Sequence, residues 1–341
     1  MNSKLISVVL FFTTAIPLQI IAEVQSYSLE AGQNAVGVTL IKPAWLSGTI
    51  GAVDTAGMRV QDFAIPTAAA SAPILWDAVP AYLEISSSPA NVALVGERYD
   101  VVVTANPSTN QGWISLRNAP WNTRQDLPAG LVGASYTIRP HWTLANLFGN
   151  GARSFLRVAR SSASADEVIL PAPNTETLQS FFLCSDPATK GWRLGKDRKG
   201  PEQSQSILAP GMGLLIHAKG PLVFSLYGEA RKHALRRPLQ AGQNLISLGQ
   251  PQALRLGDLI TNTSTPLRAG SVPALADGVS FLSGVRHERF YPSLISGKVQ
   301  WLCTTSTYPA DVGELDILGP NRAFWIQKRQ ADPNFTLPFT R

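Results

Sequence analysis

Charged residues are scarce in this sequence. Asp, Glu, Lys and Arg make up 15% of the 341 residues, whereas hydrophobic residues make up 45%. The chain can therefore bury real cores, and its surface must rely on uncharged polar side chains more than on charge. Glycine (27 residues) and proline (25 residues) are frequent and scattered, which favours many short strands and turns over long helices.

Recognised catalytic motifs are also missing. The sequence has no Gly-x-Ser-x-Gly elbow, no His-Glu-x-x-His, no phosphate loop and no Cys-x-x-Cys. Its four histidines stand apart, and none has metal-ligand spacing to another. We therefore predict no catalytic residue, no metal site and no cofactor, although residues that are distant in sequence can still converge in a folded enzyme.

Cysteine is nearly absent, with Cys184 and Cys303 the only two. In an oxidising compartment they could form a disulfide between the two halves of the chain. The alternative is a pair of free, buried thiols, and the sequence leaves both alternatives open.

Long apolar runs are confined to the N-terminus. Lys4 precedes an uncharged, mainly apolar segment over residues 5–16, and Ala22 offers a small residue before a plausible cut. This pattern predicts a signal peptide over residues 1–22 and a mature chain from about Glu23. No later segment is apolar for long enough to span a membrane as a helix. We therefore expect no transmembrane segment after signal removal, and a protein that is secreted or held in the periplasm or at the outer cell surface.

Basic residues exceed acidic ones, giving a net charge of +6, but they are dispersed. Small basic clusters occur at residues 196–199 and 231–237, and neither is interleaved with aromatic residues as a groove for nucleic acid requires. We therefore expect no nucleic-acid partner. The second cluster is interpreted as a solvated linker.

An internal repeat organises the chain. Leu29-Glu-Ala-Gly-Gln-Asn34 returns as Leu239-Gln-Ala-Gly-Gln-Asn244, at an offset of 210 residues. Four further motifs recur in the same order at offsets of 109 to 112: Leu144-x-x-Leu147 and Leu256-x-x-Leu259, Ala165-Asp166 and Ala276-Asp277, Phe181 with Trp192 and Phe290 with Trp301, and Ile207-Leu208 and Ile317-Leu318. The difference of about 98 residues predicts an insertion in the first copy.

These observations predict a mainly β protein of two tandem β-sandwich or barrel-like modules with short helices. The first module covers residues 23–230 and is interrupted at about residues 48–140 by a small β subdomain of three to five strands. The second, compact module covers residues 237–341. Repeated tryptophans are expected in the two cores, and the repeated Asp166 and Asp277 are expected in turns or caps.

Several aromatic residues in or beside the insertion have no counterpart in the second module. Such residues are freer to serve a function than the repeated ones are, although core packing is the commonest role of any one of them. The candidates for ligand contact are Trp113, Trp121, Trp45, Trp76, His141 and Trp142.

Three segments carry a resemblance to a known family: residues 139–148 (RPHWTLANLF), residues 165–168 (ADEV) and residues 207–213 (ILAPGMG). They resemble an uncharacterised family of exported bacterial proteins with a signal peptide and two β-rich halves, over nearly the whole mature chain. The resemblance implies export and this architecture, and it transfers no catalytic residue.

Together these features favour an exported, non-catalytic protein for binding, adhesion or envelope structure. The sequence does not identify its ligand; the candidate partners are polysaccharide and envelope protein. Two alternatives stay open. One is a hydrolase that acts on an extracellular polymer such as polysaccharide, and the other is a subunit of a larger surface assembly.

Overall fold

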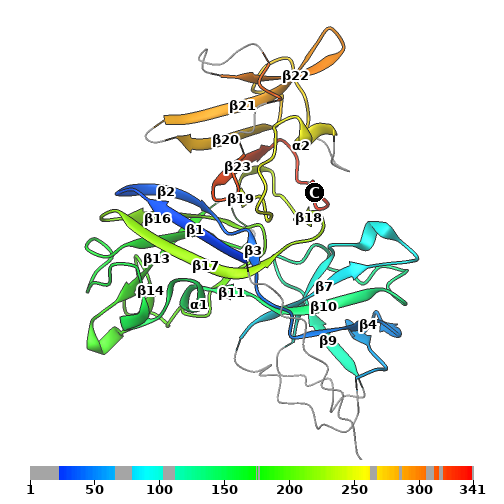
Figure 1. Ribbon diagram of the computed structural model, residues 1–341, viewed down its shortest axis with the longest axis horizontal. Coiled ribbons are helices and arrows are strands. Elements are labelled where there is room, and N and C mark those ends of the chain that lie inside the picture. Colours follow the sequence, from blue (N-terminus) through cyan, green and yellow to red (C-terminus); the bar gives the residue numbers. More distant parts are fainter. Residues whose placement is uncertain are drawn as a thin grey trace, which may run out of the picture.

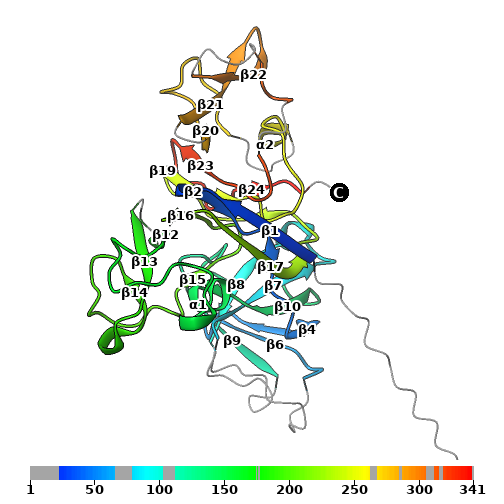
Figure 2. The ribbon, with the colours of Figure 1, turned by 60° about the vertical axis from the view of Figure 1, so that its left-hand side comes forward.

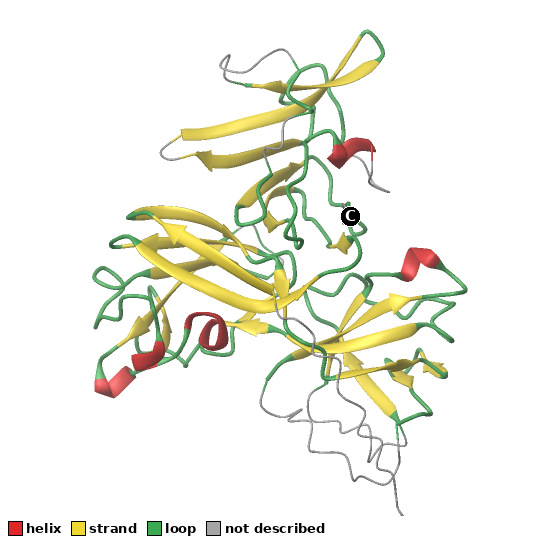
Figure 3. Cartoon of the chain, viewed as in Figure 1, coloured by secondary structure: helices red, strands yellow, loops and turns green. Residues whose placement is uncertain are grey.

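The computed structural model describes residues 23–65, 79–102, 112–173, 175, 177–261, 267–283, 286–304, 311–314 and 318–339. The expected signal peptide and Trp76 lie outside these residues. The fold is mainly β, as predicted: strands take up 46% of the chain and helices 6% (Figure 3). The described residues form two short α-helices, α1 (Leu144–Phe148) and α2 (Asp258–Thr261), besides three single-turn 3-10 helices. No helix in the described ranges is long and apolar enough to cross a membrane.

The first part of the chain forms a five-stranded antiparallel sheet covered by a three-stranded one. In sheet order, the five strands are β14 (Gly191–Leu194), β13 (Leu178–Cys184), β12 (Glu167–Pro171), β16 (Gly213–Ala218) and β2 (Gly32–Gly37). The covering strands are β1 (Glu23–Leu29), β17 (Leu222–Ala230) and β3 (Leu40–Ile41). Tyr27 and Phe224 stack at 4.6 Å between ring centroids, and α1 adds Leu144 and Phe148 to the same core.

The last part of the chain forms a second five-stranded antiparallel sheet. In sheet order its strands are β22 (Lys298–Cys303), β21 (Arg286–Ile295), β20 (Gly278–Ser283), β23 (Ala323–Lys328) and β19 (Gly242–Ser247). Its core is separate from the first, and the short pair β18 (Leu235–Arg236) and β24 (Thr336–Leu337) contributes to it. In Figure 1 this part lies at the top, above the first sheet.

The two five-stranded sheets have the same strand order and register. Val168 pairs with Phe181 on one side and Ile216 on the other, as Val279 pairs with Phe290 and Ile326 in the second sheet; these are residues that recur in the sequence. The repeated tryptophans are both buried in their cores, as expected. The match is compatible with two tandem modules.

The repeated polar residues have identical roles in the two sheets. Asn34 and Asn244 each accept a hydrogen bond from the backbone N–H four residues earlier and donate to that residue's carbonyl. In both copies the glycine two residues before the asparagine has a positive φ, 104° at Gly32 and 94° at Gly242. Glycine adopts this conformation readily. The asparagine of the motif Ala-Gly-Gln-Asn therefore closes a turn with its side chain, and the motif recurs because both turns have the same backbone geometry.

Asp166 and Asp277 each connect two backbone segments through hydrogen bonds to the carboxylate. Asp166 accepts hydrogen bonds from the backbone N–H groups of Arg157 and Lys219, both at 2.7 Å. Asp277 accepts from those of Arg268 and Arg329, at 2.9 and 2.7 Å. Both aspartates are buried, and each closes a loop at the start of a strand, as the sequence suggested.

The insertion has more strands than predicted. Its curled antiparallel sheet has seven strands in the order β4 (Leu46–Thr49), β10 (Ser135–Pro140), β7 (Ala81–Ser87), β8 (Arg98–Val101), β9 (Trp113–Arg117), β6 (Arg59–Gln61) and β5 (Ala52–Asp54). Three to five strands were expected because β4, β5 and β6 are only three or four residues long and show no clear apolar alternation. The two edge strands are consecutive in the chain: Ile50 N–H donates to Ala134 O, and Gly51 N–H donates to Gln61 O, so the sheet curls back on itself.

The three units meet around the first sheet. The outer face of β16 and β2 packs on β19 and β23 through Leu215, Leu245 and Ala323. The approach is close at Gly213, where an added Cβ would lie 2.7 Å from Ala323 Cβ. The insertion lies next to the end of β17, where it also borders the second module (Figures 1 and 2).

The hydrogen bonds that Asp166 accepts from the backbone provide a test of the fold. Replacing Asp166 with Ala should leave two partly buried N–H groups without their acceptors, at a cost of about 1–3 kcal/mol for the pair. We expect the midpoint of thermal unfolding to fall by several degrees. The matched change Asp126→Ala removes an exposed carboxylate paired with Arg124 and should shift the midpoint by about one degree or less. Equal effects of the two changes would contradict the assigned role.

Candidate functional site

The segment from Arg231 to Arg237 joins the three units. Arg231 and Glu84, on β7 of the insertion, form an ion pair in which the two side chains are 1% and 2% exposed. Arg236 Nη1 lies 3.1 Å from Glu97 Oε1, also in the insertion. The interpretation of this basic cluster as a solvated linker was therefore wrong. Its carboxylate partners lie about 140 residues away in the sequence, so the pairing could not be read from local composition.

The charge state of Glu84 follows from its neighbours. Burial alone would raise the pKa of this carboxyl, but Arg231 and then His233 more than offset that and hold it below its usual value. His233 Nε2 lies 3.7 Å from Glu84 Oε2. The pair is therefore ionised at neutral pH, and the insertion is tied to the linker by a buried charge interaction.

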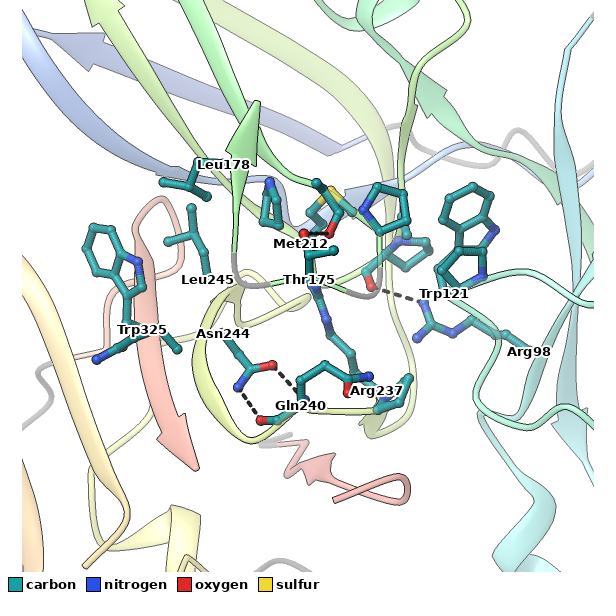
Figure 4. Close-up of a pocket in the computed structure, with 18 residues that line it drawn as sticks. Arg98, Trp121, Thr175, Leu178, Met212, Arg237, Gln240, Asn244, Leu245 and Trp325 are labelled. Atoms are coloured by element: carbon teal, nitrogen blue, oxygen red, sulfur yellow. Dashed lines mark hydrogen bonds between the residues drawn. The ribbon is translucent and has the colours of Figure 1, made fainter. Parts of the chain in front are cut away.

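A pocket of about 280 Å³ opens where the three units meet (Figure 4). We call it the junction pocket. Trp121 comes from the insertion, Leu178 and Met212 from the first module, and Leu245 and Trp325 from the second. Its size is at the lower end of small-molecule sites, which are typically about 300–1,000 Å³.

Two arginines give the junction pocket its electrostatic character. Arg98, on β8, donates from Nη1 to Pro210 O at 3.0 Å and from Nη2 to Arg236 O. Arg237 donates from Nη1 to Gly211 O at 2.6 Å. Burial lowers the pKa of each guanidinium to about 10, so both remain charged at neutral pH. Neither forms an ion pair with a carboxylate in the described part of the chain.

A second, more open hollow adjoins the junction pocket. It has a volume of about 650 Å³ and is lined by residues 118–120 and 122–126 of the insertion together with Pro333 and Asn334. Pro120, Pro238 and Gln240 line both spaces. A ligand in the junction pocket could therefore extend into the hollow.

Behind Trp121 lies a buried polar cluster centred on Asp100. Its Oδ1 accepts the indole N–H of Trp121 at 2.6 Å and lies 2.8 Å from His141 Nε2. Its Oδ2 accepts from Arg117 Nη2 at 2.8 Å and Nε at 3.0 Å. The carboxylate side chain is fully buried, and the cluster fixes the orientation of Trp121 at the pocket wall.

The protonation of this cluster can be assigned from its surroundings. Burial lowers the pKa of His141 and outweighs the opposite influence of Asp100. Burial would raise the pKa of Asp100, but hydrogen bonds from His141, Trp121 and Arg117 together hold it below its usual value. At neutral pH a neutral His141 therefore donates its Nε2–H to an ionised Asp100.

The structure brings together two of the six candidate contact residues. The rings of Trp121 and His141 lie 6.0 Å apart between centroids, and only Trp121 lines the junction pocket. Trp113 packs under Arg59, with Arg59 Cζ 4.7 Å from the ring centroid. Trp142 donates its indole N–H to Leu40 O at 2.9 Å, and Trp45 packs against the insertion core. The described candidates therefore do not form one exposed aromatic surface.

Cys184 and Cys303 are not joined by a disulfide. Cys184 is buried beside Phe182, with its Sγ 3.4 Å from Thr189 Oγ1, whereas Cys303 packs against the core of the second module. The alternative of two buried thiols therefore describes Cys184, whereas Cys303 is only partly buried.

Sequence reasoning missed the two arginines that line the junction pocket and Trp325. The available signal was the Arg236-Arg237-Pro238 segment between the modules, which was assigned to solvent. Arg98 had no signal, since it is an isolated arginine in a short strand. Among the residues in the described ranges, no group of three or more His, Cys, Asp or Glu side chains could hold a metal ion.

No protein-family model matches this chain, and no curated protein matches it. Function must therefore be inferred from the geometry of the site.

The neutral state of His141 predicts a pH dependence of stability. Because its folded pKa lies below that of the unfolded chain, about 6.5, the unfolded state binds the extra proton first. Stability should be full above that pH and should fall as the pH decreases through 6.5 towards the folded pKa. Each such histidine changes the free energy of unfolding by at most about 1.4 kcal/mol per pH unit. His233, whose pKa is lowered mainly by burial, adds to the effect.

The change His141→Gln keeps a donor for Asp100 and removes the titration. We expect the thermal midpoint to depend less on pH between 7.5 and 5.5 in this variant than in the wild type. The matched variant His287→Gln alters an exposed histidine and should keep the wild-type slope. An unchanged slope in His141→Gln would contradict the assignment.

Proposed function

We propose that this chain is an exported, non-catalytic binding protein whose ligand occupies the junction pocket. The observation that carries the proposal is the composition of the pocket wall, to which all three units contribute side chains. Small-molecule sites are preferentially formed at interfaces between domains, where a few polar groups converge among apolar ones. Trp121 offers an apolar surface, and the polar groups are supplied by Arg98, Arg237 and the Gln240 amide.

The hydrolase alternative receives less support from the site. A glycosidase places two carboxyl groups on either side of the bond it cleaves, about 5–10 Å apart. Of the described residues, no Asp or Glu lines the junction pocket, and Asp126 is the one carboxylate that lines the adjoining hollow. The buried Glu84 and Glu97 are engaged by arginines of the linker. We therefore favour binding over hydrolysis.

Export is part of the proposal and rests on the sequence. The apolar segment at residues 5–16 supports it, as does the resemblance to a family of exported bacterial proteins. Polysaccharide or another envelope component remains the expected source of the ligand.

Narrowing the junction pocket tests the proposal. Leu178 lines it and is 44% exposed, so Leu178→Trp should be tolerated by the fold and should obstruct the pocket. The control Val223→Trp adds the same side chain at an exposed position on β17 that does not line it. Binding to a panel of cell-envelope glycans and small metabolites is measured by calorimetry. We expect wild type and control to bind a common ligand and Leu178→Trp to bind it at least ~10-fold more weakly. Retention of full affinity by Leu178→Trp would contradict this location.

A further inference from the structure

The charges around the junction pocket do not balance. Four arginines meet there, Arg98, Arg231, Arg236 and Arg237, and two carboxylates, Glu84 and Glu97, face them. Glu84 is paired with Arg231 and Glu97 with Arg236. Both carboxylates also attract Arg98 from beyond ion-pair distance, but the group keeps an excess of two positive charges, and no carboxylate is paired with Arg98 or Arg237 in the described part of the chain. These are also the two arginines that line the pocket.

Leaving two guanidinium charges in a protein junction is unfavourable unless something compensates them, because burial removes their hydration. Main-chain carbonyls offset part of this cost: each arginine donates to at least one carbonyl, of Pro210 for Arg98 and of Gly211 for Arg237. Carbonyls supply partial charges only. Each guanidinium has five N–H donors in a fixed planar arrangement that suits carboxylate and phosphate oxygens.

Arg237 has guanidinium N–H groups that donate to no described acceptor. Its one described side-chain hydrogen bond uses Nη1, and the residue is only partly buried. Arg98 is 3% exposed, and its Nε has no partner among the described residues. In the close-up of Figure 4, Arg98 lies beside Trp121 and Arg237 lies beside Gln240.

The remaining wall limits the body of the ligand. Proline, methionine and leucine side chains make much of the surface. Besides the two arginines, the polar side chains of the wall are Thr175, Gln240, Gln243 and Asn244. A volume of about 280 Å³ suits a single ring or one sugar unit rather than an extended chain.

We propose that the junction pocket is an oxyanion site, which takes a compact organic anion whose carboxylate or phosphate group lies between Arg98 and Arg237. This inference deepens the proposed function and rests on it. The excess of two positive charges predicts that affinity increases with ligand charge. The ring or apolar body then contacts Trp121 and the prolines.

A charge series on one scaffold tests the inference. Glucose, glucuronate and glucose 6-phosphate share a ring and carry no charge, one negative charge and nearly two. Benzyl alcohol, benzoate and phenyl phosphate form the same series on an apolar ring. Affinity is measured by calorimetry at constant ionic strength. We expect the anions of at least one series to bind more tightly than their neutral counterpart, by at least ~10-fold for the phosphate.

The variant Arg237→Met removes one charge, and Lys232→Met is its control, since Lys232 is an exposed residue of the same linker. We expect Arg237→Met to weaken anion binding at least ~10-fold, as loss of a charge-assisted hydrogen bond would, and Lys232→Met to change it less than ~2-fold. Gly211 O keeps the N–H of Ser247 as a donor, at 2.9 Å. Without ligand, the thermal midpoint of Arg237→Met should therefore be unchanged or raised.

The outcomes separate this inference from the proposed function. If neutral and anionic compounds bind equally, or if Arg237→Met leaves anion affinity unchanged, the proposal of an oxyanion site is wrong. A neutral ligand that Leu178→Trp excludes would then still support a binding pocket. If no compound of either series or of the wider panel binds the wild type, both proposals fail. A marked fall in the midpoint of ligand-free Arg237→Met would make the arginine structural and would also overturn the inference.

Discussion

The ion pair between Arg231 and Glu84 is the interaction on which the arrangement of the three units depends. Both side chains are almost completely buried, and they join the segment after β17 to the middle of the insertion sheet. A second pair, Arg139 with Glu229, joins β10 of the insertion to the end of β17 at 2.5 Å. Two charge pairs at neighbouring points define both the position and the orientation of the insertion on the first module.

Such pairs are not a strong source of stability, because desolvation offsets most of the attraction. Their effect here is on geometry. With Arg231 held by Glu84 and Arg236 by Glu97, the linker passes along the insertion before it enters the second module. Arg237, the next residue, is thereby placed at the pocket wall. The pocket thus follows from the path of seven linker residues, and its uncompensated charge follows from the two carboxylates being engaged by other arginines.

How much could be predicted from the sequence depends on whether a feature is local. Asn34 and Asn244 recur because each closes a turn with neighbours four residues away, and Val168 and Val279 recur because each occupies the same register in its sheet. The strands of the insertion at Trp113–Arg117 and Ser135–Pro140 alternate between core and surface, so they too could be anticipated. Strands β4, β5 and β6 could not, because three or four residues carry too little periodicity.

The site could be predicted only in part. Trp121 was a candidate because it has no counterpart in the second module, and it does line the pocket. Arg98 and Arg237 lie 139 positions apart, and what unites them is that neither forms an ion pair with a carboxylate in the described part of the chain. That property exists only in three dimensions. The same reason explains the error over residues 231–237, whose charges look solvated until Glu84 and Glu97 are placed beside them.

A double-mutant cycle on Arg231 and Glu84 tests most directly whether this pair anchors the three units. The free energy of unfolding is measured in urea for wild type, Glu84→Gln, Arg231→Met and the double variant. Each single change leaves one buried group without its partner and should cost about 3–5 kcal/mol. The double variant should cost clearly less than the sum, with a coupling energy of about 1–3 kcal/mol. Additive effects, or single changes that cost less than about 1 kcal/mol, would contradict the anchoring role of the pair.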